Sequence, residues 1–246
     1  MTMQNILKRI FLLILFLSLL PCVFAQESPA QQAYNEGDYL QAAKLYKEQL
    51  NTTADPSAVL YYNLGNSYYK LGLTSKALAC YYRAWRMDPR DEDIFHNLSF
   101  VLGQNAQSLI PTDVPASVFH LFFYLSIIEL EGLLWLLGWL FVIVLIFVLL
   151  SHSKKLKQLL ILLGSIILLT GIWYGFRVSI DKKPLAVVNK FQAEVRSGPG
   201  ASFPVNLSVP RNHIVEVKDT KDDWAQIYIP EEKAQGWVLK DSLEEI

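Results

Sequence analysis

Two stretches of 19 residues without a charged side chain, residues 132–150 and 158–176, limit the folds open to this chain. As helices rising about 1.5 Å per residue, each is roughly 28 Å long, which matches the hydrocarbon core of a bilayer. The link between them, residues 151–157, carries three lysines. The sequence therefore predicts two membrane-spanning helices, 127–150 and 158–177, joined by a tight basic turn.

The first 25 residues have the pattern of an export signal. Lys8 and Arg9 precede the apolar run 10–20, and small residues end the segment before residue 26. We expect cleavage after Ala25, so that residues 1–25 are a signal peptide. An uncleaved anchor and a lipoprotein signal ending at Cys22 are the alternatives. Each of the three exports the residues that follow.

The lysine-rich turn 151–157 belongs in the cytoplasm by the positive-inside rule. Together with an exported N-terminal part, this predicts two spans in a bacterial inner membrane, with both flanking modules in the periplasm. One signal opposes this orientation, because three basic residues also follow the second span: Arg177, Lys182 and Lys183.

Residues 106–126 are predicted to form a linker and then a short helix that lies at the membrane surface. Pro111 and Pro115 interrupt any helix, and residues 118–125 are rich in phenylalanine. Ser126 and Glu129 have the spacing of a capping box, which predicts that the first span begins at residue 127.

Charge and motifs exclude several classes of protein. Residues 26–113 and 184–246 each carry 7 basic and 10 acidic side chains, so neither has the basic surface that nucleic-acid binding requires. Cys22 and Cys80 are the two cysteines, too few for a disulfide scaffold or a cysteine metal site. The sequence holds no zinc-protease, nucleophile-elbow or phosphate-loop motif. We therefore expect no enzyme activity, no cofactor and no metal.

Residues 26–105 repeat at a spacing of 35, as the pairs Ala42 and Ala77, and Gly37 and Gly72, illustrate. The second copy matches eight marker positions of the tetratricopeptide repeat, a pair of antiparallel helices. These positions are Tyr61, Leu64, Gly65, Tyr68, Ala77, Tyr81, Ala84 and Pro89. Gly72 suits the stop of the first helix and Thr74 the cap of the second. With a looser first copy and a closing helix after Asp91, the module is an all-α stack of about two and a half repeats.

Stacks of this type bind peptides on the concave face that the first helix of each repeat lines. In this register the face presents aromatic and amide side chains with little positive charge, which argues against a clamp for acidic peptide ends. The candidate peptide-binding residues are Tyr62, Asn63, Asn66, Tyr69, Lys70, His96 and Asn97. The alternative for Asn63 and Asn97 is that they only satisfy local polar groups.

Residues 184–246 change to short β runs separated by turns. Arg-Ser-Gly-Pro-Gly at 196–200, Asp-Trp at 223–224 and Gly-Trp-Val at 236–238 follow in the order and spacing of bacterial SH3-type domains, which this segment resembles. The resemblance implies an all-β small barrel that binds cell-wall peptides or protein segments. Its expected groove residues are Arg196, Trp224 and Trp237, although Trp224 could instead cap the core.

The arrangement as a whole resembles the BatE family, the E proteins of the Bat (aerotolerance) operon. The resemblance implies an envelope scaffold that acts beside von Willebrand-type membrane proteins and has a link to oxidative stress. We expect a non-enzymatic inner-membrane scaffold that binds membrane or periplasmic proteins through the repeat groove, with the lipid bilayer as its other partner. The alternative is a cell-wall receptor that holds peptidoglycan through the barrel and positions a wall hydrolase.

Overall fold

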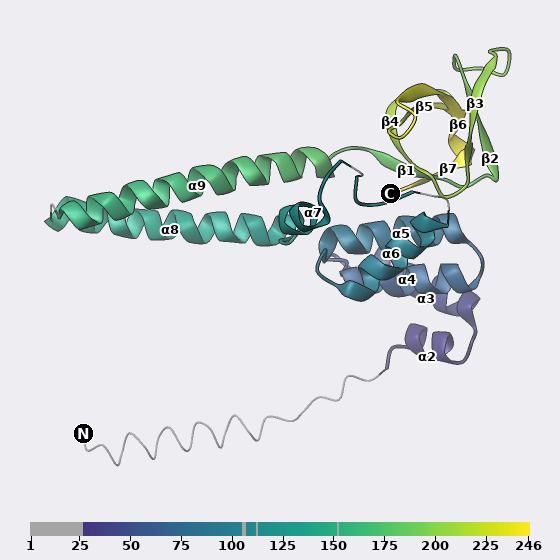
Figure 1. Ribbon diagram of the computed structural model, residues 1–246. Helices are drawn as coiled ribbons and strands as arrows, with labels where there is room; N and C mark the ends of the chain where they lie inside the picture. Colours follow the sequence, from purple (N-terminus) through teal and green to yellow (C-terminus); the bar gives the residue numbers. More distant parts are fainter. Residues whose placement is uncertain (1–26, 105–106, 112, 152) are drawn as a thin grey trace.

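The computed structural model describes residues 27–104, 107–111, 113–151 and 153–246. The predicted signal peptide, residues 1–25, lies outside the described residues. The described chain consists of a helical stack, a long helical hairpin and a β-sheet (Figure 1). Figure 1 shows the stack and the sheet together at one end of the hairpin.

Five helices form the stack, each packed against the next: α2 (Pro29–Asn35), α3 (Tyr39–Thr52), α4 (Ala58–Lys70), α5 (Thr74–Met87) and α6 (Glu92–Gly103). The side chains of Ser28, Ser57 and Asp91 cap three of them by accepting hydrogen bonds from backbone N–H groups. Gly37 and Gly72 have positive φ angles of 86° and 74°, which end α2 and α4 and let the chain turn back.

Helices α4 and α5 cross closely at Gly65. A Cβ atom there would lie 2.7 Å from two ring carbons of Tyr81 and 3.3 Å from the Cβ of Cys80. Ala77 and Ala84 of α5 are fully buried. The small residues of the repeat pattern therefore lie at the buried contacts of this helix pair.

Helix α5 is also buried on the side away from α4. Its Leu78 and Trp85 share one apolar cluster with Phe119 of the short helix α7 (Ala116–Phe122) and Val187 of the sheet. The Trp85 and Phe119 rings stack with centroids 6.0 Å apart. The sheet and α7 thus supply the packing surface that so short a repeat stack lacks.

Hydrogen bonds join the start of α5 to the turn before β4. The Ser75 hydroxyl, 5% exposed, lies 2.7 Å from Asn212 Oδ1 and 3.1 Å from the carbonyl of Val188. Thr74, predicted to cap α5, is instead its first residue, and its hydroxyl donates to Asn212 Oδ1 (3.0 Å). Leu73 holds the cap position. The hydroxyl expected to close the helix end therefore binds the sheet module.

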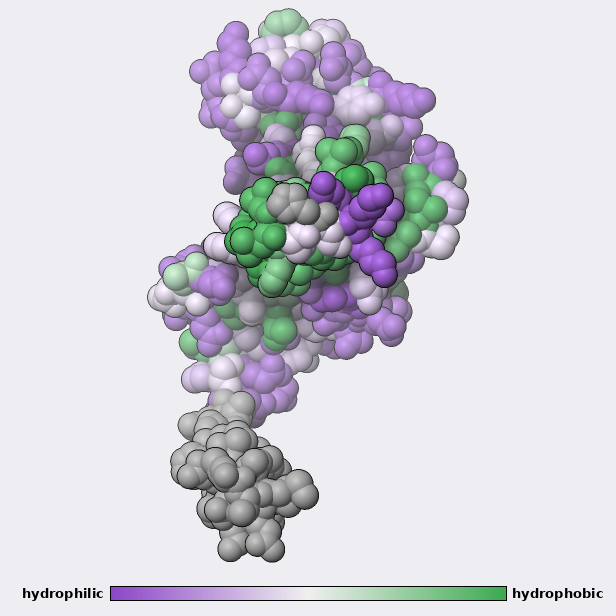
Figure 2. Space-filling view, turned by 90° about the vertical axis from the view of Figure 1, so that its left-hand side faces the viewer, coloured by the Kyte–Doolittle hydropathy of each residue, from purple (hydrophilic) through white to green (hydrophobic). Residues whose placement is uncertain are grey.

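The hairpin consists of α8 (Ile127–Ser151) and α9 (Lys154–Asp181), both long and apolar enough to cross a membrane. Most of their large apolar side chains are exposed, and Figure 2, which views the hairpin from its turn, shows hydrophobic surface between the hydrophilic surfaces of stack and sheet. The capping box is confirmed: Glu129 accepts from the Ser126 N–H (2.9 Å), and Ser126 Oγ accepts from the Glu129 N–H (3.3 Å). The turn lysines lie in the first turns of α9, whose cap position is Ser153.

Seven antiparallel strands form the C-terminal sheet in the order β3-β2-β6-β5-β4-β1-β7. They are β1 (Leu185–Val188), β2 (Gln192–Arg196), β3 (Val205–Pro210), β4 (Ile214–Lys221), β5 (Trp224–Ile229), β6 (Ala234–Leu239) and β7 (Leu243–Glu245). The all-β fold of this module is confirmed, but the sheet does not close into the predicted small barrel. In the described chain β3 pairs only with β2, and the three-residue β7 pairs only with β1, so both strands are edges. One residue pair, Arg196 with Trp237, joins β2 to β6, where a Cβ on Gly236 would lie 2.5 Å from Val195.

We expect Gly65→Ala to destabilise the protein by about 1–3 kcal/mol, since the added methyl overlaps the buried Tyr81 ring. Thermal unfolding of the detergent-solubilised protein measures the change. Gly103→Ala is the matched control, because a Cβ at position 103, also in a helix, meets no atom within 4 Å. Equal melting temperatures for the two variants would contradict the close crossing of α4 and α5.

Candidate functional site

Helices α2, α4, α5 and α6 border a cavity of about 300 Å³. We call this cavity the groove. Its lining consists of Tyr34, Tyr62, Asn66, Tyr69, Lys70, Tyr81, Asn97, Phe100 and Val101. Five of the seven residues predicted for peptide binding are therefore brought together in one place.

Two asparagines form the polar centre of the groove. Asn66 Oδ1 accepts hydrogen bonds from the Tyr81 hydroxyl (2.8 Å) and from Asn97 Nδ2 (3.1 Å). Asn97 Nδ2 also donates to the Tyr62 hydroxyl (3.0 Å). Burial raises the pKa of Tyr81 above its ordinary value, so its hydroxyl stays protonated and remains a donor.

This network fixes the orientation of both amides. Within the described part of the chain, Asn66 Nδ2 and Asn97 Oδ1 have no hydrogen-bond partner. The groove thus offers one free amide donor and one free amide acceptor, the pair that a peptide backbone needs. Asn97 does bind local polar groups, which was the alternative to a peptide-binding role. It does so only through its Nδ2 donor.

Aromatic rings form the walls beside the asparagines. Tyr62 and Tyr81 lie with centroids 5.9 Å apart, and Tyr69 meets Phe100 edge to face at 6.2 Å. Lys70 is the cation of this lining. Such a surface suits uncharged or apolar side chains between backbone contacts.

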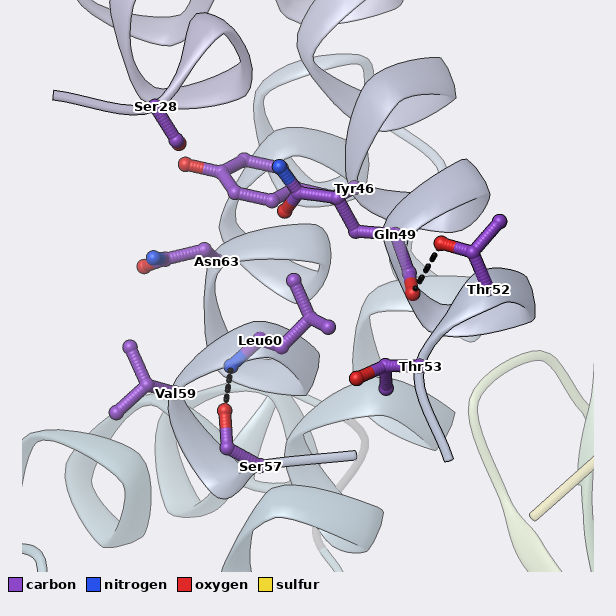
Figure 3. A pocket seen from close by; sticks show the side chains of 9 residues that line it. All are labelled: Ser28, Tyr46, Gln49, Thr52, Thr53, Ser57, Val59, Leu60 and Asn63. Carbon is purple, nitrogen blue, oxygen red and sulfur yellow. Dashed lines mark hydrogen bonds between the residues drawn. The ribbon is translucent and has the colours of Figure 1, made fainter. Parts of the chain in front are cut away.

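Asn63 and His96 lie outside the groove. Asn63 borders a neighbouring hollow of about 470 Å³ with Leu60, Tyr46 and Ser28 (Figure 3). His96 lies in a separate cleft between α6 and α7. Helical spacing predicted that both side chains lie on the face formed by the first helices. In the structure each lines a hollow next to the groove.

Tyr34 also lines the groove, although it is not among the residues predicted from the sequence. Tyr34 lies 35 residues before Tyr69, just as Gly37 lies 35 before Gly72. The repeat spacing was therefore a signal that could have found it, although the first repeat departs from the pattern elsewhere.

The three residues predicted for the sheet module share one face. Arg196 lies opposite Trp237, and Trp237 lies opposite Gln226, two residues along β5 from Trp224. Both tryptophans are half-buried and lie outside the buried cluster of the sheet.

The guanidinium of Arg196 is already engaged. It donates to the carbonyls of Ala201 (2.9 Å) and Phe203 (2.8 Å) and forms an ion pair with Glu194. These bonds hold the β2–β3 loop, so Arg196 has little capacity left for a ligand carboxylate.

The family model of the tetratricopeptide repeat matches residues 58–91, which cover α4, α5 and the following turn. None of the curated proteins compared with the chain matches it. Among the described residues, no group of three or more His, Cys, Asp or Glu side chains could hold a metal ion. Helices α4 and α5 are therefore a tetratricopeptide repeat, a module that generally mediates protein–protein interaction.

Proposed function

We propose that this protein is a membrane-anchored, non-enzymatic scaffold whose groove binds an extended segment of a partner protein. The observation that carries the proposal is the pair of oriented asparagines, Asn66 and Asn97, at the centre of an aromatic-walled hollow in a repeat module. The sheet and α7 pack with Leu78 and Trp85 of α5, neither of which lines the groove.

The chemistry of the groove defines the ligand class. Asn66 Nδ2 donates to a peptide carbonyl and Asn97 Oδ1 accepts from a peptide N–H, which requires an extended backbone. The rings of Tyr34, Tyr69 and Phe100 contact its side chains. With Lys70 as the cation of the lining, a peptide end that carries several carboxylates is a poor ligand.

The location follows from the hairpin. Lys154, Lys155 and Lys157 occupy the first turns of α9, where positive charge opposes the helix dipole. Their placement therefore does not serve helix stability, and we infer that they hold the turn in the cytoplasm. Stack and sheet then both lie in the periplasm. The resemblance to BatE proteins supports an envelope complex linked to oxidative stress as the setting.

A photo-crosslinking residue in place of Tyr69 tests the groove. We expect benzoylphenylalanine there, in the full-length protein in native membranes, to form a discrete protein adduct on irradiation. The same residue in place of Leu40, 72% exposed on α3, should give none.

Asn66→Ala combined with Asn97→Ala should lower the adduct yield about tenfold, because two hydrogen bonds of about 0.5–1.5 kcal/mol each are lost. Asn51→Ala, at an exposed position on α3, is the matched control. An unchanged yield in the double variant, with melting preserved, would remove the groove from the proposal.

The alternative, a peptidoglycan receptor, rests on the exposed edges of Trp224 and Trp237 on one sheet face. We expect purified full-length protein to stay in the supernatant when peptidoglycan is sedimented. Arg196 is engaged in its own loop, and the module's 7 basic against 10 acidic residues give no attraction to an anionic wall. Sedimentation of most of the protein, abolished by Trp237→Ala, would make the receptor the better proposal.

Reporter fusions test the topology. A reporter inserted after Ser153, with the following lysines retained, should report the cytoplasm, and fusions after Gln104 and Ile246 should report the periplasm, because those lysines hold the turn inside. A periplasmic signal at Ser153 would reverse the orientation of the whole protein.

A further inference from the structure

A second hollow lies on the membrane side of the stack. It has a volume of about 700 Å³ and lies between the start of α6 and helix α7. We call it the membrane-side cleft. Its lining consists of Pro89, Arg90, Asp91, Glu92, Asp93, Phe95, His96, Ser99, His120 and Tyr124.

The charge of the membrane-side cleft is negative. Glu92 and Asp93 are exposed, and neither takes part in a hydrogen bond or ion pair among the described residues. Arg90, the cation of the lining, forms an ion pair with Glu129 of α8 and lies 5.5 Å from the centroid of the Tyr124 ring. Two free carboxylates therefore face the cleft while its arginine is neutralised.

The walls of the cleft are aromatic. Phe95 meets the His120 ring edge to face at 5.2 Å, and Tyr124 lies on the α8 side. An acidic hollow with aromatic walls favours a cationic side chain with an apolar stem, since such a ring attracts a cation as the carboxylates do.

The cleft adjoins the groove along α6. The rings of His96, in the cleft, and Phe100, in the groove, lie nearly parallel with centroids 6.5 Å apart. A chain that leaves the groove past Phe100 therefore reaches the cleft next.

The far side of the cleft is next to the apolar hairpin. Leu121 and Ile128, on α7 and α8 beside Tyr124, are 70% and 74% exposed. Exposed apolar side chains next to a helix that is apolar enough to span a membrane mark a surface that contacts the bilayer. The path from groove to cleft thus ends where a partner's chain would enter the membrane.

We propose that the membrane-side cleft binds the basic segment of a partner protein that directly adjoins that partner's own membrane span. The groove binds the more distant part of the same segment, so this inference rests on the proposed function. The occupant is a Lys- or Arg-bearing chain; a lipid headgroup and a second copy of this chain are outcomes of the test.

The test uses the full-length protein in native membranes with benzoylphenylalanine in place of His120, which lines the cleft and is exposed. The crosslinked peptide is identified by mass spectrometry and compared with the one captured from position 69. We expect the same partner at both positions. The peptide captured at position 120 should contain two or more basic residues and lie closer to the partner's membrane span than the peptide captured at position 69.

Charge variants test the electrostatic part. Glu92→Gln with Asp93→Asn should lower the adduct yield at position 120 about threefold or more, as expected for two lost ion pairs at an exposed site. The matched control is Glu48→Gln with Asp55→Asn, at exposed positions remote from the cleft. Raising the salt from 50 to 500 mM should reduce the yield of the parent protein but not that of the cleft variant.

Several results would overturn the inference. They are a lipid adduct alone at position 120, an adduct with a second copy, or a partner peptide without basic residues. A partner captured at position 69 with no adduct at position 120 would overturn the cleft and leave the groove intact. No adduct at position 69 would instead count against the proposed function itself.

Discussion

The burial of α5 from two sides is the packing arrangement on which the rest of the structure depends. On one side Gly65 lets α4 approach the Tyr81 ring and Cys80 of α5 closely. On the other side Leu78 and Trp85 pack with Phe119 and Val187. A stack of so few repeats buries little apolar surface by itself, and each fully buried large side chain contributes about 1.5–3 kcal/mol. The sheet and α7 are therefore part of the core of the repeat module.

The same helix and the turn after it also contact the apolar hairpin. Arg86 at the end of α5 forms an ion pair with Asp181 at the end of α9, and Arg90 forms one with Glu129 near the start of α8. Arg177, 3% exposed, donates to the carbonyls of Phe122 (3.0 Å) and Leu125 (2.8 Å). A buried guanidinium needs such acceptors to offset its lost hydration, so this contact resists displacement. The groove is thereby held at a defined position relative to the hairpin.

This arrangement explains why the two candidate surfaces differ. In the stack, the side of α4 that faces away from the sheet keeps free amide groups. In the sheet, Arg196 uses its donors on its own loop. Three of the five N–H donors of Arg196 are thus used within the module, whereas Asn66 Nδ2 and Asn97 Oδ1 have no hydrogen-bond partner among the described residues. These free groups are the reason that our proposal places ligand binding in the repeat module and not in the sheet.

Local patterns predicted what depends on local physics. The helix pair of the repeat, the capping box at Ser126 and the two long apolar helices all follow from spacing, because helix periodicity and capping act within a few residues. The repeat spacing also placed Tyr62, Asn66, Tyr69, Lys70 and Asn97 on one face, and in the structure these five line one cavity. His96 and Asn63 came from the same spacing, yet each lines a different hollow.

The sequence by itself determined the helix pair of the repeat, the two apolar spans, the change to β structure after residue 184 and five residues of the groove, because these depend on neighbours in the chain. Only the tertiary structure decided that the sheet stays open, that Thr74 binds Asn212 instead of capping α5, and that the sheet closes the back of the repeat stack. Residues 74 and 212 are 138 positions apart, and a hydrogen bond between them exists only after both modules have folded and docked. No periodicity in the chain encodes such a contact, since it depends on the shapes of two finished surfaces.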